Sequence, residues 1–357
     1  MELIRPDINI DFVGHRYKAF VLSAALIFLG LAAMVYRGGL NLGVDFAGGT
    51  LIQVKFNKPT SPDEIRDALK DMISQTAVQQ VGSSSDNEYL LRTDLSTTEM
   101  QNLSQTVEES LEKAYGEGNA TVLRVEMVGP KVGHDLRQKA LFAIYYALLL
   151  MSVYISGRFE LKWTIAGIMA GIMVVGVYFL EAVGINVTVL ILGALVLTLV
   201  LCWVLKLPYA LGATLCLIHD VLITVGAFAI FDKEVTLEVL AAILTLVGFS
   251  MNDTIVIFDR IRENLRKSRG MDFKEVINLS INQTLSRSII TSGTVFLVVV
   301  CLFFFGGTVI HDFSFALLIG IIAGSYSTIF VASPLLILFE DLKKKGKPAR
   351  KRASSTA

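Results

Sequence analysis

The chain has 357 residues, of which 53% are hydrophobic and 18% are charged, and its formal net charge is zero. Soluble domains usually carry about 25% charged residues, so this composition, with a mean hydropathy of +0.60, excludes an ordinary soluble protein and predicts a membrane protein. The zero net charge by itself says nothing about a partner, because the distribution of charge matters more than its sum, and no nucleic-acid partner is expected of this membrane protein. The three cysteines have neither metal-site nor disulfide-framework spacing.

Eight apolar runs approach the length of about 20 residues that a membrane helix needs. A short N-terminus, residues 1–17, precedes the first run at 18–36, which is too long for the apolar core of a signal peptide and is expected to be an uncleaved anchor. Residues 138–341 are expected to form the rest of the bundle. Its candidate spans are 139–156, which is short and rich in tyrosine, 163–180, 188–205, 210–230, 237–258, 285–305 and 313–339.

Residues 37–137, between the first two spans, have the polar character of a soluble domain. Their pattern reads strand, helix, strand, strand, helix, strand, which predicts a ferredoxin-like α+β domain. Ser61 before a proline marks the start of the first helix. Ser96 with Glu99 fits a capping box for the second helix, which ends near Tyr115. Strands are expected at 50–56, 78–81, 89–92 and 121–128.

Lysine and arginine in short loops mark the cytoplasmic side of a membrane protein. The segment 259–274 and the tail 342–357 are densely basic, whereas the three loops predicted on the other side hold one lysine and no arginine. Both termini are therefore predicted to be cytoplasmic, with the large polar domain on the outer side.

Two opposite charges lie in neighbouring predicted spans. Asp253 is about 9 Å inside the cytoplasmic end of its helix, and Arg287 lies at a similar depth in the next one. Attraction to an arginine favours an ionised carboxylate, whereas removal from water favours the neutral form. A small motion could therefore make Asp253 take up or release a proton. The alternative is a static ion pair that joins the two helices.

A second intramembrane pair, His219 and Asp220, could relay protons, since histidine changes charge near neutral pH, or could be a polar contact between helices. Glycines spaced four apart in 167–171 and 320–324 predict close helix packing. The sequence has no nucleotide-binding loop, metal cluster or catalytic triad, so no enzymatic activity is expected.

Five motifs, in order along the chain, resemble the SecD/SecF family of protein-export membrane proteins. Two flank the polar domain: 44–50 (VDFAGGT), which also reads as a tight turn before the first strand, and 128–133 (VGPKVG). The others, at 217–224, 249–264 and 286–293, are similar to the SecF side of the family.

The resemblance implies half of a resistance-nodulation-division transporter fold in the bacterial inner membrane, with the α+β domain in the periplasm. It implies SecD, the SecY-E-G channel and YajC as partners, and assistance to unfolded preproteins late in export, driven by the proton-motive force without a cofactor. It places Asp253 and Arg287 on the family's proton-coupling pair, with Asn252 beside them as a further relay or contact residue. An independent proton-coupled transporter of small molecules or lipids, or a passive scaffold, stays an alternative.

The chain departs from this family in one respect. SecF proteins usually have six spans, whereas eight are predicted here, and the surplus falls at residues 164–205. The segments on either side, 158–163 and 205–212, resemble neighbouring parts of the family pattern. Two added helices preserve the topology, so we expect a peripheral hairpin that leaves the charged site intact.

Overall fold

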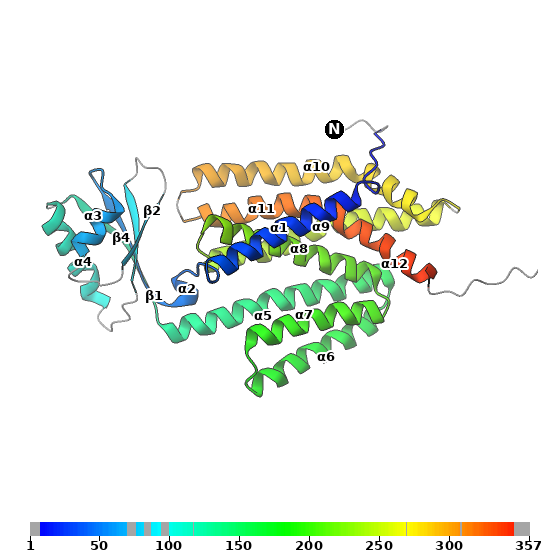
Figure 1. Cartoon of the computed structure of the whole chain (residues 1–357), viewed down its shortest axis with the longest axis horizontal. Coiled ribbons are helices and arrows are strands. Elements are labelled where there is room, and N and C mark those ends of the chain that lie inside the picture. The colour runs from blue at the N-terminus through cyan, green and yellow to red at the C-terminus, as the bar shows by residue number, and fades with distance from the viewer. Residues whose placement is uncertain are drawn as a thin grey trace, which may run out of the picture.

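The computed structural model describes residues 8–69, 76–81, 87–93, 100–116, 118–268, 270–307 and 309–345. A bundle of long helices carries a small α+β domain at one end (Figure 1). Eight helical segments of the described chain are long and apolar enough to cross a membrane. The predicted fold class, a polytopic helical membrane protein with one α+β domain, is confirmed.

The bundle begins with α1 (Arg16–Tyr36), which leads to the α+β domain. Two π-helical turns, η1 (Ser156–Glu160) and η2 (Thr328–Ala332), follow α5 and α11. The span at 139–156 proves to be part of a long helix that begins at a proline, which suits a first helical turn because its missing N–H is not needed there. The later helices are α5 (Pro130–Ile155), α6 (Trp163–Ala182), α7 (Val187–Val204), α8 (Pro208–Phe231), α9 (Leu237–Lys267), α10 (Phe273–Phe305), α11 (His311–Ser327) and α12 (Ser333–Lys345).

Helices α9 and α10 are longer than the membrane requires. They have 31 and 33 residues, or about 47 and 50 Å, against a hydrocarbon core of about 30 Å. The segment 259–274, predicted to be a loop, is therefore mostly helical, and that boundary prediction is wrong. Its arginine, lysine and glutamate residues are good helix formers, and they continue both helices past the apolar run.

The predicted span at 313–339 is one helical path with an irregular turn inside it. Pro334 has no N–H, and its ring would collide with the carbonyl of residue 330 in a regular helix. The π turn η2 lies directly before it, and Ser333 Oγ donates to the carbonyl of Thr328 at 3.0 Å. The proline thus accounts for the π turn between α11 and α12.

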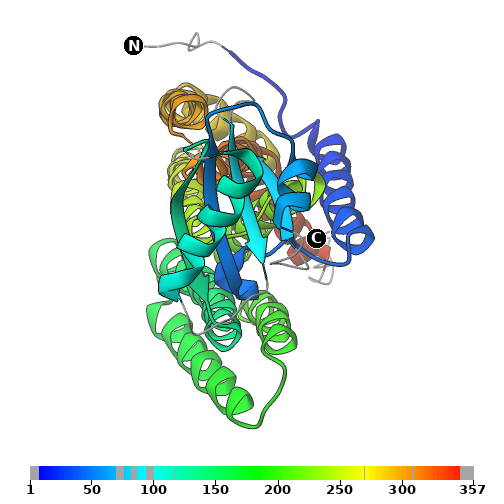
Figure 2. The ribbon, with the colours of Figure 1, turned by 90° about the vertical axis from the view of Figure 1, so that its left-hand side faces the viewer.

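The α+β domain contains a four-stranded antiparallel sheet in the order β2-β3-β1-β4, with two helices packed on one face (Figures 1 and 2). Its elements are β1 (Gly49–Phe56), α3 (Pro62–Leu69), β2 (Thr76–Val81), β3 (Glu88–Thr93), α4 (Met100–Tyr115) and β4 (Ala120–Val128). This element order is that of the predicted ferredoxin-like fold.

Local capping residues start the first helix of this domain. Ser61 Oγ accepts the backbone N–H of Glu64 at 3.3 Å, and Glu64 Oε2 accepts that of Ser61 at 3.2 Å. The pair forms a capping box, which satisfies two backbone donors at the helix start. The second capping box predicted, Ser96 with Glu99, lies outside the described residues.

The two motifs that flank the domain meet at its junction with the bundle. The short helix α2 (Val44–Ala47) is followed by Gly48, with a φ of +78°, and a side chain there would lie 2.8 Å from Pro130 Cα. Asp45 Oδ2 also accepts the backbone N–H of Leu237, at the start of α9, at 2.9 Å. The segment predicted to be a tight turn is a one-turn helix that ends in Gly48, and it anchors the domain on two helices.

Helix α8 lies at the centre of the bundle and packs against α1, α5, α7, α9 and α11. The hairpin of α6 and α7 lies at one edge, beside α5 (Figure 1). The two glycine stripes, the pairs of glycines spaced four apart in 167–171 and 320–324, therefore differ in their surroundings. A side chain at Gly320 on α11 would collide with Leu246 on α9, as predicted for close packing, whereas Gly167 and Gly171 on α6 face open space. The packing prediction for 167–171 is wrong, since no helix of the described chain covers that face.

Candidate functional site

Asp253 lies inside the bundle. It is buried on α9, and its Oδ2 accepts a hydrogen bond from Ser292 Oγ on α10 at 2.7 Å. The serine is buried as well. A carboxylate in a membrane span is costly unless it is paired or hydrated, and here a neutral hydroxyl is its bonded partner.

Arg287 lies on the helix that carries this serine, but on a different side of it. Five residues separate Arg287 from Ser292, which places their side chains about 140° apart around a helix. The arginine is exposed, and no ion pair within the described residues joins it to Asp253. The two charges therefore lie on adjacent helices, as expected, without direct contact in this arrangement.

Asn252 also lies away from the buried carboxylate. It is exposed on α9, next in sequence to Asp253 and about 100° from it around the helix. It takes no part in the buried hydrogen bonds described below. The structure thus brings Asp253 together with Ser292, and it does not bring Asn252 or Arg287 into that contact.

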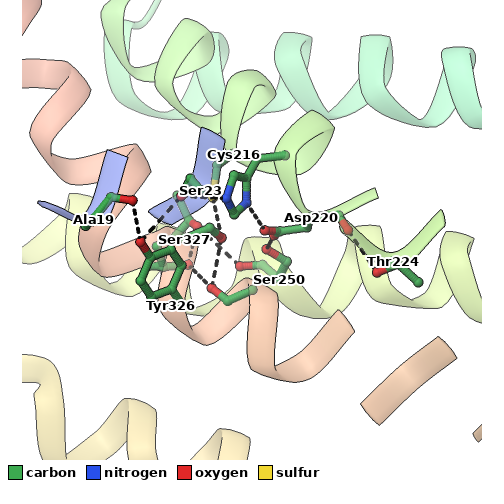
Figure 3. A network of polar contacts seen from close by, with 12 residues as sticks. Ala19, Ser23, Cys216, Asp220, Thr224, Ser250, Tyr326 and Ser327 are labelled. Carbon is green, nitrogen blue, oxygen red and sulfur yellow. Dashed lines mark hydrogen bonds and ion pairs between the residues drawn. The ribbon is translucent and has the colours of Figure 1, made fainter. Parts of the chain in front are cut away.

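His219 and Asp220 are the centre of a separate buried network. Figure 3 shows this network around Asp220. His219 Nδ1 lies 3.0 Å from Asp220 Oδ1, and Ser250 Oγ on α9 donates to Asp220 Oδ2 at 2.6 Å. The other imidazole nitrogen, Nε2, lies 2.9 Å from Ser23 Oγ on α1. The imidazole connects α8 to α1 through Ser23, and Asp220 connects α8 to α9 through Ser250. The pair therefore joins three helices.

Helix α11 approaches this network closely because it has a glycine at the contact. A side chain at Gly324 would lie 3.2 Å from Ser250 Oγ and 3.5 Å from Asp220 Oδ2. The next residues of α11 and η2 supply further contacts: Cys216 Sγ lies 3.0 Å from the hydroxyl of Ser327, and the hydroxyls of Thr254 and Thr328 lie 3.0 Å apart. The network thus extends from α8 across α9 to α11.

Sequence reasoning missed the hydroxyl partners of this site. One signal was available on α9, where Ser250, Asp253 and Thr254 are spaced three and four residues apart and so share a helix face. Ser23 and Tyr326 carried no local signal, since each meets His219 only through the folding of distant helices.

A carboxylic acid bonded to a serine can exist in either protonation state. The hydroxyl donates to the ionised carboxylate and can accept from the neutral acid. Asp220 and Asp253 both have such a partner, Ser250 and Ser292 respectively. Each of these two hydrogen bonds can therefore persist in either protonation state of the acid, with the hydroxyl as donor or as acceptor.

Comparison with known sequences places this geometry in a family. The family model for "Protein export membrane protein SecD/SecF, C-terminal" matches residues 106–200 and 172–342, and the SecD/SecF GG motif matches residues 38–60. The chain belongs to the SecD/SecF family. The two longer matches overlap at residues 172–200, inside the α6–α7 hairpin.

Relatives within this family are similar over nearly their whole length. The protein translocase subunit SecF of Calditerrivibrio nitroreducens is 38% identical over 97% of this chain and 99% of its own. The protein translocase subunit SecF of Desulfurispirillum indicum is 40% identical, and the alignment covers 92% of this chain and 91% of that protein. These names describe a translocase subunit rather than an enzyme. The chain is therefore a multi-pass membrane protein of Sec-associated protein export.

A solved structure shows the same fold. SecDF of Thermus thermophilus, a translocon-associated membrane protein, superposes with a TM-score of 0.70 at 27% identity. The alignment covers 95% of this chain and 40% of the SecDF chain. The chain thus spans less than half of that protein.

Proposed function

We propose that this chain is the SecF-type subunit of a bacterial inner-membrane translocase, and that it uses the proton-motive force to help draw unfolded preproteins outward late in export. It works with SecD, the SecY-E-G channel and YajC. Both termini are cytoplasmic, and the α+β domain is periplasmic, in agreement with the basic segments at 259–274 and in the tail.

The observation that carries the proton-coupling role is the environment of Asp253. It is a buried carboxyl group in a membrane span, bonded to a neutral hydroxyl, on the helix beside the one that carries Arg287. Burial away from water favours the neutral acid, because the hydrogen bond donated by Ser292 only partly offsets the lost hydration and brings no counter-charge. A shift of α10 that turned Arg287 toward α9 would favour the ionised form. Protonation and the relative position of the two helices are thereby linked.

The exposed side chains of α9 and α10 support SecD as a partner. Thr245 and Asn252 are exposed within the span of α9, and Arg287 and Thr294 are exposed on α10. Arg287 lies about 27 Å from the outer end of its helix, near the inner boundary of a core about 30 Å thick. Polar groups at this depth normally face protein or water rather than lipid, so a second helical subunit is a fitting cover.

The test is preprotein export in cells that carry Asp253→Asn or Arg287→Met, with protein level and assembly with SecD measured in parallel. Both variants are expected to lose most export while assembling normally. Asp259→Asn is the matched control, because this carboxylate lies on α9 too but forms a partly exposed ion pair with Arg158 at 2.6 Å. Normal export in both variants would reject the proton-coupling role.

A further inference from the structure

Helix α1 packs on one side against α8 and η2, and its other side is open. Its buried residues are Ala19, Ser23 and Gly30, and much of the remaining surface is exposed. Gly30 packs against Gly226 of α8, where a side chain on Gly30 would lie 2.7 Å from Gly226 Cα. The other two residues contact the network of His219. After α1 the chain reaches the α+β domain through a segment bonded to the α8–α9 loop, where Arg37 pairs with Asp232 at 2.9 Å and the Gly43 N–H donates to the carbonyl of Val235 at 2.9 Å. The contacts of Ala19 and Ser23 hold the first half of α1.

Two side chains connect α1 to the network (Figure 3). Ser23 Oγ lies 2.9 Å from His219 Nε2 and 3.4 Å from the hydroxyl of Tyr326 on α11. Tyr326 in turn donates to the carbonyl of Ala19 at 2.7 Å, and its ring is stacked 6.2 Å from the imidazole. The Ser23 hydroxyl therefore lies within reach of two partners, His219 and Tyr326. The hydrogen bond from Tyr326 also fixes the backbone of α1 one turn before Ser23.

The protonation state of His219 decides which group accepts the hydrogen of the Ser23 hydroxyl. While Asp220 is ionised and the imidazole neutral, Nδ1–H donates to the aspartate, so Nε2 accepts and Ser23 gives it its single proton. When the imidazole gains a proton, Nε2 also becomes a donor. Ser23 must then accept, and its own hydrogen is free to bond Tyr326. One proton thus reverses the bond that holds α1.

We infer that Ser23 and Tyr326 are positioning residues that transmit proton uptake by the His219–Asp220 pair to α1, and through it to the α+β domain. The inference rests on the proposed function, namely that this bundle takes up protons during its cycle. It resolves the alternatives of relay and static contact: the pair is a contact whose hydrogen-bond direction depends on protonation.

The groups that face the imidazole agree with this assignment. Among the described residues, the ionisable groups in contact with it are Asp220 on the same helix and the phenol of Tyr326 on α11. Helix α1 brings the Ser23 hydroxyl, and α9 brings Ser250, which bonds Asp220 rather than the ring. Asp253, one turn along α9, bonds a serine of α10 instead. A change in charge of the imidazole is therefore felt first by α1 and α11, whereas α9 contacts the pair through Asp220.

The test follows the position of α1 in the complete chain, assembled with SecD in lipid vesicles. Spin labels are placed on cysteines introduced at Tyr36 and Val183, which are 92% and 76% exposed near the outer ends of α1 and α6. Exposed Cys301 is replaced by serine beforehand. The distance between the labels is measured between about pH 8 and about pH 5, the range in which histidine ordinarily changes charge. We expect a distance shift in the parent chain.

Four variants test whether Ser23 and Tyr326 transmit the protonation of His219 to α1 or only stabilise the fold. Ser23→Ala and Tyr326→Phe should lose the pH-dependent shift while the chain still assembles, and Ser23→Thr, which keeps a hydroxyl, should retain it. Ser314→Ala is the matched control, because this buried serine has no hydrogen-bond partner for its Oγ among the described residues, and it should behave as the parent.

Absence of any shift in the parent, or a full shift in both Ser23→Ala and Tyr326→Phe, would overturn the inference. The export assay keeps this outcome distinct from failure of the proposed function. If Asp253→Asn abolishes export while the Ser23 and Tyr326 variants keep their shift, the inference alone falls. If Asp253→Asn and Arg287→Met both export normally, the proposed proton-coupling role falls.

Discussion

The central helices and the α6–α7 hairpin are both apolar enough to span a membrane, yet they are built differently. In an apolar stretch of 18 residues, 56% of the stretch is buried in α8, against 22% in α6. The buried polar groups of the centre bond from helix to helix, as Ser250 does with Asp220 and Ser292 with Asp253. In the hairpin, buried Thr198 bonds the carbonyl of Ala194 in its own helix.

This difference shows that hydropathy alone does not distinguish the central helices, which carry the buried polar site, from the peripheral α6–α7 hairpin. Association of helices within a membrane depends on close packing and on hydrogen bonds between helices, because lipid tails are as apolar as leucine. The central helices have both features. The hairpin has a weak cross-helix contact, between Cys202 Sγ and Ser152 Oγ on α5 at 3.3 Å. The comparison can be tested by changes made in matched positions of the two regions.

The largest effect is expected from leucine at matched glycines. Gly320→Leu forces a side chain into Leu246 of α9, and overpacking of a tight contact costs about 1–3 kcal/mol or more. Gly167→Leu on α6 meets open space and should be nearly neutral. Thermal unfolding of the purified proteins in detergent measures both. An equal loss of stability in the two variants would show that the two regions are not packed differently.

The two glycine stripes also show where sequence reasoning stops. Both have the same spacing, so the sequence predicts close packing for both, but the outcome depends on whether a neighbouring helix covers the stripe. The eight spans and the motif positions were predictable because an apolar run and a turn are local features. Which side of α10 Arg287 faces was not, since it depends on how the helix is rotated in the bundle.

The same limit applies to the buried network. His219 and Asp220 stood out because ionisable residues are rare in apolar runs. Ser23 is an ordinary serine in the first span, and its role follows from the contact with a helix almost two hundred residues later. The ends of α9 and α10 were misplaced for a different reason: apolarity marks the membrane boundary, whereas charged residues with high helix propensity carried both helices beyond it.

A smaller effect is expected from removing the hairpin itself. Its two ends lie side by side: Lys162 Nζ donates to the carbonyl of Leu205 at 3.0 Å, and Glu160 Oε1 accepts the backbone N–H of Tyr209 at 2.9 Å. A chain that lacks residues 163–205 can therefore join α5 to α8 directly. We expect it to retain most preprotein export, measured together with protein level and assembly.

Removal of α6 alone, residues 163–186, is the control for this deletion. It takes away a single span, which reverses the side of every later loop and should abolish export. Export lost in the 163–205 deletion despite normal protein level and assembly would mean that the hairpin takes part in the function of the central helices.

The smallest effect concerns the contact between the bundle and the α+β domain. Glu234, in the loop between α8 and α9, lies 4.0 Å from Arg92 on β3, and both side chains are mostly buried. Burial raises the pKa of Glu234, and the opposing effect of Arg92 is smaller. A carboxyl group whose pKa is raised by docking binds protons better in the docked state. Docking should therefore weaken as pH rises from about the ordinary glutamate value of 4.5 through the raised pKa.

The amide of Val235 reports this contact, because its N–H donates to the carbonyl of Asn41 at 2.8 Å across the junction. Its protection from hydrogen exchange, corrected for intrinsic pH dependence, should fall with rising pH by the equivalent of about 1 kcal/mol or less. Glu234→Gln, neutral at every pH, should remove this dependence, and Arg92→Met should move it to higher pH because the opposing charge is gone. Glu238→Gln, an exposed neighbour on α9, should leave it unchanged. If the dependence persisted in Glu234→Gln, another group would control the junction, and docking would be independent of this buried carboxyl.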